Sequence, residues 1–336
     1  MQPKISLQDI AIRLGVSVKT VSGALHNRSI RMSEETRRKI RSLADELGYE
    51  PNLIARGMRS GVMPIIGMIG DGLITQPFAS EIVRSFDNVL RTHDLSILVT
   101  DIAGGRGIEQ GLAELQRLLP RGIVYASMYH HVVALPAGAR GMIELMINCR
   151  EADNAVPALV PAERQAGFNV TRYLIERGRR DIAFLTLPGL VASSLREHGL
   201  RAAFETHDLI VNEDWIRPAT RGATYSDRAR SVVREQIAEW MAAPQRPDAI
   251  LCGNDRVALE VYGALRRVGV DIPGDVAVAS FDNQVEIAAR LDPPLTTMAL
   301  PHREMGRIAG EILAGQRNKP DTVEEIPFRL IERASV

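Results

Sequence analysis

The sequence predicts a small all-α headpiece followed by a larger α/β core built on parallel sheets. Residues 7–26 have the spacing of two short helices joined by a turn. From about residue 64, short apolar runs alternate with longer amphipathic stretches, as in repeated β-α-β units. The chain has 336 residues and is 45% hydrophobic, which allows two or three domains with a large buried core.

The first helix is predicted over residues 7–14. Its apolar residues recur at the spacing of one helical face, so we expect that face to be buried: Leu7, Ile10, Ala11 and Leu14. Gly15 should end the helix, because glycine adopts a left-handed backbone without a steric penalty. Ser17 is a suitable N-cap for a second helix whose inward side carries Val21 and Leu25.

The second helix should present a polar face to its surroundings. We expect the outward residues to be Val18, Lys19, Thr20, Ser22 and Gly23. Ser33 is predicted to cap a third helix, with Glu34 and Glu35 in its first turn and Gly48 beyond its end. The first two helices, joined by the turn at Gly15, have the spacing of a helix-turn-helix, a motif whose second helix enters the major groove of DNA. A small helical hairpin that does not bind DNA would show similar spacing.

The charge distribution agrees with contact between DNA and the headpiece. Residues 1–60 hold eleven Lys or Arg and six Asp or Glu, a net of +5, whereas the whole chain sums to zero. The rest of the chain is therefore acidic by the same amount. A basic region on an acidic body is the expected electrostatic pattern when one part alone meets phosphates.

The core should contain parallel strands with helices between them. Strands are predicted over residues 65–69, 96–100, 122–125, 143–147, 182–186, 249–252, 276–280 and 326–331. Helices are predicted over residues 79–92, 108–119, 163–177, 196–207, 226–241 and 255–268. In such sheets ligands bind beyond the carboxyl ends of the strands, so the loops there are the candidate sites.

Three segments in order resemble the lactose and galactose repressor family. They read VSVKTVSGALHN, SEETR and LGYEPNLIARGMRSG. The resemblance implies a helix-turn-helix headpiece over residues 1–50, a hinge helix and linker over 51–61, and a core over 62–336 similar to periplasmic sugar-binding proteins. It further implies two lobes with a cleft between them. The N-lobe is expected at about 62–162 and 293–322, and the C-lobe at about 163–292 and 323–336.

Several later segments match the family residue by residue. They are GNDRVALEVYGALRRVGVDIPGDVAVASFDN from residue 253, SLREHGLRAAF from 194, MINC from 146 and PPLTTMALPHREMG from 293. The resemblance assigns effector contacts to Asn148, Arg196, Asn254, Arg256 and Asp282. The residue types alone favour capping or turn formation for Asn254 and Asp282, and a surface ion pair for Arg196.

The strand predicted at 122–125 supplies further candidates. We expect Tyr125 in the effector site, and Met128, Tyr129 and His130 in the following loop could also line the cleft. Adjacent histidines point in different directions, so the pair of His130 and His131 is expected to serve loop structure or face solvent instead of binding a metal.

The resemblance also implies the DNA-contacting residues. They are Ser17, Val18, Lys19, Thr20, Ser22, Asn27 and Arg28 in the headpiece, and Asn52, Ala55 and Met58 in the hinge. Met58 stands where the family has an apolar side chain that wedges between base pairs of the operator. Gly23 departs from the arginine usual at its position, so a contact is missing there and the operator half-site is expected to differ.

Enzyme signatures are weak in this chain. Gly105, Gly107 and Gly111 miss the G-x-G-x-x-G spacing by one residue, and Ser193, His198 and Asp282 form a triad only by selection. Cys149 and Cys252 are the only cysteines, without metal-ligand spacing. We therefore expect no catalytic residues, no metal and no cofactor. A nicotinamide-dependent oxidoreductase and an exported solute-binding protein are the competing interpretations.

The resemblance implies a ligand-responsive repressor of carbohydrate uptake or catabolism genes, with double-stranded operator DNA and a sugar-type effector as partners. An inducer and a corepressor are both compatible with it. No long apolar segment is present, so a cytoplasmic protein without membrane contact is expected. No heptad pattern follows the last predicted strand, which favours a homodimer over a tetramer.

Overall fold

The computed structural model describes residues 5–25, 32–49, 57, 61–73, 80–102, 105–226 and 228–336. The chain divides into two compact units, Met1–Met63 and Pro64–Val336. Most of the predicted hinge lies outside the described residues, as do the expected DNA contacts Asn27, Arg28, Asn52, Ala55 and Met58.

The first unit holds the three predicted helices, α1 (Leu7–Leu14), α2 (Val18–Leu25) and α3 (Glu34–Glu46). Ser6 and Asp9 form a capping box at the start of α1, and Gly15 ends it with a φ of 62°. Ile10, Val21 and Ile40, one from each helix, are fully buried against one another in a single small core. Gly23 was expected on the outward face of α2 but is buried, because α2 packs that side into the headpiece core.

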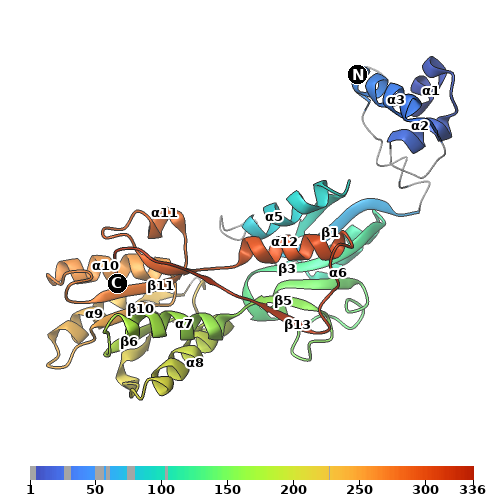
Figure 1. Cartoon of the computed structure of the whole chain (residues 1–336). Helices are drawn as coiled ribbons and strands as arrows, with labels where there is room; N and C mark the ends of the chain where they lie inside the picture. The colour runs from blue at the N-terminus through green and yellow to red at the C-terminus, as the bar shows by residue number, and fades with distance from the viewer. Residues whose placement is uncertain are drawn as a thin grey trace. The chain divides into compact units, whose positions relative to one another are not determined.

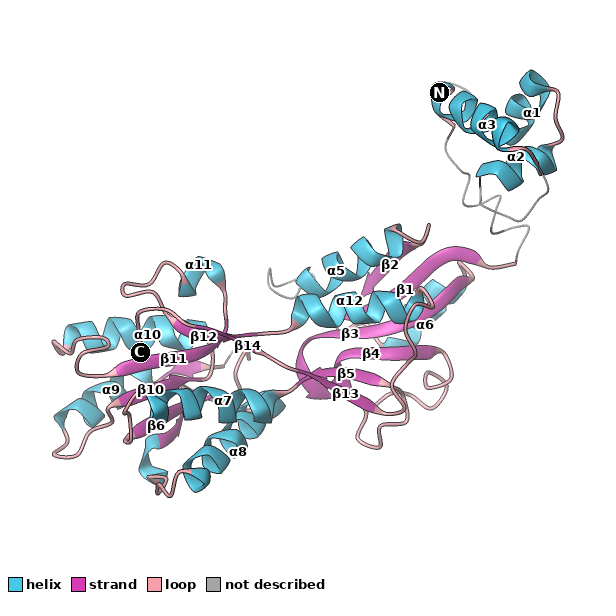
Figure 2. Ribbon diagram, in the orientation of Figure 1, coloured by secondary structure: helices cyan, strands magenta, loops and turns pink. Residues whose placement is uncertain are grey.

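The second unit consists of two lobes, each with a central sheet between layers of helices (Figure 2). The N-lobe sheet has the order β13-β5-β4-β3-β1-β2. Its strands are β1 (Met63–Asp71), β2 (Ser96–Asp101), β3 (Pro120–Val132), β4 (Ile143–Arg150), β5 (Ala158–Pro161) and β13 (Val323–Ile326). Helices α5 (Ser80–Arg91) and α12 (His302–Leu313) pack on one face and α6 (Ile108–Gln116) on the other.

The C-lobe sheet has the order β14-β12-β11-β10-β6-β7. Its strands are β6 (Ile182–Thr186), β7 (Ile216–Pro218), β10 (Ala249–Cys252), β11 (Ala277–Asp282), β12 (Thr296–Ala299) and β14 (Arg329–Ile331), of which β14 alone is antiparallel to its described partner. Helices α9 (Val233–Ala242) and α10 (Asp255–Arg267) cover one face, and α7 (Glu163–Glu176) and α8 (Val191–Thr206) the other. The remaining elements are the 3-10 helix η1 (Glu213–Trp215), α11 (Val285–Ala288) and the two-stranded ribbon of β8 (Thr220–Arg221) and β9 (Arg230–Ser231).

The chain passes between the lobes three times, as Figure 1 shows in the middle of the core. The first crossing follows β5, at the expected position near residue 162. The expected crossings near 292 and 323 were wrong, because β12 still pairs with β11 and β13 still pairs with β5. The real crossings lie between β12 and α12 and between β13 and β14. Pro293 and Pro294 therefore lie in a loop inside the C-lobe.

Candidate functional site

The headpiece presents one exposed face on α2. The hydroxyl oxygen of Ser17 accepts a hydrogen bond from the Thr20 backbone amide at 3.0 Å, which caps the helix start. Val18 and Lys19 are exposed, whereas Thr20 and Ser22 are partly buried. The N-terminal end of α2 is therefore the part of this helix whose side chains can reach a partner.

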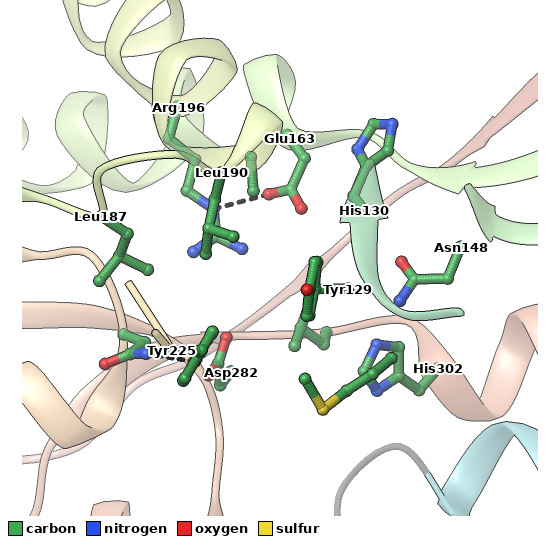
Figure 3. A pocket seen from close by; sticks show the side chains of 14 residues that line it. Tyr129, His130, Asn148, Glu163, Leu187, Leu190, Arg196, Tyr225, Asp282 and His302 are labelled. Carbon is green, nitrogen blue, oxygen red and sulfur yellow. Dashed lines mark hydrogen bonds and ion pairs between the residues drawn. The ribbon is translucent and has the colours of Figure 1, made fainter. Parts of the chain in front are cut away.

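The core holds a cavity between its two lobes, lined by residues from both (Figure 3). It contains about 430 Å³ of empty space, part of which is open to solvent. The lining residues are Met128, Tyr129, His130, Asn148, Glu163, Leu187, Leu190, Ala192, Arg196, Tyr225, Asn254, Asp282, Leu300 and His302. Most of them lie at or just beyond the carboxyl ends of β3, β4, β6, β10, β11 and β12, where parallel sheets place their ligands.

Arg196 on α8 is the central cation of the cavity. It is 3% exposed, its Nε donates to Glu163 Oε2 at 2.6 Å, and its Nη1 donates to the Gly253 carbonyl at 2.6 Å. Its guanidinium lies 4.2 Å from the centre of the Phe281 ring, a cation–π contact. These contacts fix the guanidinium plane and leave its Nη2 without a hydrogen bond to any described residue.

Two glycines bring this ion pair together. Gly167 on α7 and Gly199 on α8 face each other so closely that a Cβ at either would overlap the backbone of the other helix. The close approach places Glu163, at the start of α7, beside Arg196 in the first half of α8.

Asp282 ends β11 and faces the cavity beside a second buried carboxylate. Asp255, fully buried at the start of α10, accepts hydrogen bonds from the Thr297 hydroxyl at 2.9 Å and the Gln284 backbone amide at 2.6 Å. Burial, and then the charge of Asp282, raise the pKa of Asp255 to about 7. Burial also raises the pKa of Asp282, although the nearby Arg196 opposes this.

Asn254 and two tyrosines form the next part of the lining. Asn254 caps α10, accepting from the Val257 backbone amide, and its amide nitrogen donates to the Tyr225 hydroxyl at 3.0 Å. The Tyr225 ring, from the loop between β8 and β9, stacks on Tyr129 of the N-lobe with 6.0 Å between ring centres. Burial raises the pKa of Tyr225 to about 12, so its hydroxyl keeps its proton.

The N-lobe contributes His130 and Asn148, both of which are buried. Asn148 donates to the Ser127 carbonyl at 3.0 Å, and its φ of 60° is one that asparagine tolerates better than most residues. His130 lines the cavity, as was one expectation for it, but the predicted solvent-facing or structural loop was wrong, because β3 extends through His130 and its ring is buried. Burial lowers the pKa of His130 to about 4, so the imidazole is neutral at physiological pH.

Of the expected effector residues, Asn148, Arg196, Asn254 and Asp282 line the cavity. Tyr125 does not, because it lies in the middle of β3, is 2% exposed in the N-lobe core, and donates its hydroxyl to Asp71. Tyr129 is the N-lobe aromatic at the cavity. Arg256 is also absent from the lining; its guanidinium donates to Gln284 behind Asp282.

Sequence reasoning did not assign a role in the site to Glu163, Tyr225 or His302. Glu163 lies just beyond the carboxyl end of β5, so predicting that strand would have marked it as a candidate. No pattern marks Tyr225, whose loop has no regular spacing.

Among the described residues, no group of three His, Cys, Asp or Glu side chains lies close enough together to hold a metal ion. In the same part of the chain, no helix combines the length and apolar character needed to span a membrane.

Each of the two units contains a segment that matches a known protein family. Residues 6–52 match the family model of bacterial regulatory proteins, lacI family, and residues 171–336 match a periplasmic binding protein-like domain. The sucrose operon repressor of Escherichia coli is 32% identical over 336 residues, covering 98% of this chain and 99% of that protein. A crystal structure of a putative lacI-family regulator from Rhizobium etli has a TM-score of 0.73 at 29% identity, covering 81% of this chain and 98% of that chain.

The lac repressor dimer bound to operator and the anti-inducer ONPF has the same fold. Its TM-score is 0.71 at 21% identity, and the match covers 99% of both chains. A helix-turn-helix headpiece on a two-lobed core with a cavity between the lobes defines a ligand-responsive, DNA-binding transcriptional regulator. The chain belongs to the lacI family of bacterial regulatory proteins.

Proposed function

We propose that this regulator represses genes for carbohydrate uptake or catabolism, and that a sugar-type inducer binding between the lobes releases it from DNA. The cavity lining supports a sugar as the ligand, because amide, guanidinium, carboxylate and imidazole groups surround two tyrosine rings. Sugar hydroxyls both donate and accept hydrogen bonds, and their C–H faces pack on aromatic rings, so they complement such a lining. The 32% identity to a sucrose operon repressor supports the same class.

The operator contacts are proposed to come from the exposed end of α2 and from the hinge. The proposed contacts are Ser17, Val18, Lys19, Thr20, Ser22, Asn27, Arg28, Asn52, Ala55 and Met58. A homodimer presenting two headpieces would bind a pseudo-palindromic operator with half-sites about one helical turn, or a multiple of it, apart. The protein is proposed to act in the cytoplasm, where its DNA lies.

The ligand is proposed to act by changing the relation between the lobes. Arg196, Asn254 and Asp282 contact it from the C-lobe, and Asn148 from the N-lobe. No catalytic role is proposed for this cavity. The Ser193 hydroxyl oxygen accepts a hydrogen bond from the Leu187 backbone amide at 2.8 Å, so this side chain stabilises the turn before α8.

The experiment selects an operator from random duplexes with the full-length protein and then measures operator affinity by fluorescence anisotropy with added sugars. We expect sequence-specific binding that a sugar weakens. Asp282→Ala should bind the operator as the wild type does and should no longer be released, because a cavity contact is missing. Asp321→Ala, which removes an exposed N-lobe carboxylate, is the control and should respond normally.

The alternatives give different results. A sugar that strengthens operator binding would make the ligand a corepressor. Release of Asp282→Ala at the wild-type sugar concentration would exclude the cavity as the effector site. Hydride transfer with a nicotinamide cofactor would support an oxidoreductase.

A further inference from the structure

The two lobes present different kinds of polar surface to the cavity. On the C-lobe side, Arg196, Asn254 and Asp282 all have hydrogen-bond partners within the protein. On the N-lobe side, His130 is 5% exposed and Asn148 is 1% exposed. Both nitrogens of His130 and the Oδ1 of Asn148 lack a hydrogen-bond partner among the described residues. Figure 3 shows Asn148 with its amide directed toward Tyr129.

Buried polar atoms without partners are rare in folded proteins, because each has lost its hydrogen bonds to water without gaining a replacement. Three such atoms on one wall of one cavity therefore indicate that a bound molecule supplies the missing partners. The Ser127 carbonyl accepts a hydrogen bond from the amide nitrogen of Asn148, so Oδ1 is the side-chain atom left to accept a hydrogen bond from the ligand. A neutral imidazole offers one donor and one acceptor.

The ligand must consequently bring two donors and one acceptor to this wall. Adjacent hydroxyl groups meet that requirement, because each can donate and accept. A phosphate dianion does not, because its oxygens only accept and leave both Asn148 Oδ1 and the unprotonated imidazole nitrogen unpaired.

The charges of the cavity point the same way. Arg196 is the one cation among the arginine and lysine side chains that line it, and it is already paired with Glu163. Glu163 and Asp282 supply two carboxylates. Burial lowers the pKa of His130, so this ring is uncharged near neutral pH and offers no positive charge to an anion. An anionic group buried beside it would lose its hydration without an opposite charge from this ring to replace it.

We propose that the wall formed by His130 and Asn148 binds an uncharged, hydroxyl-bearing end of the effector, so that this regulator responds to a free sugar or polyol and rejects its phosphate ester at that end. This inference rests on the proposed function and adds to it the chemical class of the effector.

The test measures binding to the full-length protein by isothermal titration calorimetry. The probes are matched pairs, each a neutral sugar or polyol with its own phosphate esters, among them glucose, fructose, sucrose and mannitol. We expect at least one neutral compound to bind about tenfold or more tightly than each of its esters.

Two variants locate the effect on this wall. Asn148→Gly removes Oδ1 and keeps a residue suited to the positive φ, and His130→Phe removes both nitrogens and keeps a planar ring. Each should weaken binding of the neutral ligand about tenfold or more. The far-ultraviolet circular dichroism spectrum of each variant should match that of the wild type, which shows that the variants are folded.

The outcomes separate this inference from the proposed function. An ester that binds more tightly than its parent sugar overturns the inference and leaves a sugar-responsive repressor intact. Unchanged affinity in both variants also overturns it. If no sugar and no ester binds while operator recognition is specific, the proposed effector class fails and the inference fails with it.

Discussion

At the residue scale, the Arg196–Glu163 pair explains why the C-lobe wall is ordered before any ligand arrives. Both side chains are almost completely buried, so each charge has lost its hydration and depends on the other. The bond to the Gly253 carbonyl and the Phe281 ring beneath the guanidinium hold its plane fixed. The guanidinium is therefore preformed, and a ligand in this cavity would not have to order it on binding.

Breaking this pair from one side should be costly. We expect Glu163→Ala and Arg196→Ala each to lower the free energy of unfolding by about 3–5 kcal/mol, because the remaining charge is buried without a partner. The double variant should lose much less than the sum of the two. Urea denaturation of all four proteins measures the coupling, and additive losses would show that the pair contributes little beyond its separate contacts.

His130 should make stability depend on pH in the acid range. Its pKa in the folded state is about 4, below the usual 6.5, so the folded protein resists protonation of the ring. The resulting stability is fully present above pH 6.5 and is lost as the pH falls toward 4. The loss attributable to this group is about 3 kcal/mol.

The measurement compares the free energy of unfolding of wild type and His130→Phe between pH 7 and 4. The wild type should lose more stability over this interval than the variant. Arg150, Arg196 and His131 are the charged or titratable groups that act on this ring, and all three remain in the variant. Parallel curves for the two proteins would contradict the assignment.

The family motifs predicted four of the residues that line the cavity: Asn148, Arg196, Asn254 and Asp282. Of these, Asn254 and Asp282 also lie at or just after the carboxyl end of a strand, where parallel sheets place their ligands. Tyr125 was misassigned because β3 was expected to end there, whereas it continues to Val132 with an irregularity between Ala126 and His131. That irregularity changes which side chains face the cavity, and alternation of apolar residues does not reveal it.

At the element scale, the contact between α7 and α8 positions the buried ion pair. Gly199→Ala should force the helices apart, since the added methyl would overlap the backbone of Arg164 and Phe168. We expect a loss of about 1–3 kcal/mol in the free energy of unfolding together with weaker effector binding. Gly263→Ala is the control. Gly263 lies in α10 with open space around its Cβ position, so alanine should stabilise the protein by about 0.5–1 kcal/mol. Equal effects of the two substitutions would exclude close packing as the reason for Gly199.

The recognition helix gives a second test at this scale. Lys19 is exposed near the start of α2 and can donate to guanine O6 and N7. Lys19→Ala should weaken cognate operator binding by about 1–3 kcal/mol and relax the preference at one base pair of each half-site. Lys39→Ala removes the same charge from α3, where the lysine pairs with Glu35, and should leave that preference unchanged. A uniform loss of affinity on all sequences would make Lys19 a phosphate contact.

Most helices and buried strands followed from apolar periodicity, and β6 and β10 have the predicted bounds. The exceptions include α12, β5 and β12, which were not predicted, and the single strand expected over 326–331. That segment holds the end of β13 and the separate strand β14, which belong to different sheets. Missing β12 displaced one lobe crossing, and joining β13 to β14 displaced the other. Which sheet a strand joins depends on pairing with residues far away in the chain, and local sequence carries little of that information.

At the scale of the whole molecule, an effector can change DNA affinity only if it binds differently to the two functional states of the protein. The cavity is suited to that role because its walls belong to different lobes, so a ligand that spans it senses their separation. The Tyr129–Tyr225 stack joins the same two lobes within the protein and should favour the arrangement in which the rings meet.

The coupling between effector and operator should be reciprocal and should depend on this stack. The factor by which saturating effector weakens operator binding must equal the factor by which operator weakens effector binding. Tyr129→Ala should reduce that factor, because separating the lobes then no longer breaks the Tyr129–Tyr225 stack, and the two states differ less in energy. Tyr225→Phe keeps both rings and should preserve the factor, even where loss of the hydroxyl weakens effector binding. Calorimetric titration of the effector with and without operator duplex gives the factor directly. If Tyr129→Ala retains the wild-type value, the stack lines the cavity without coupling the lobes, and the ligand's own contacts must carry the signal.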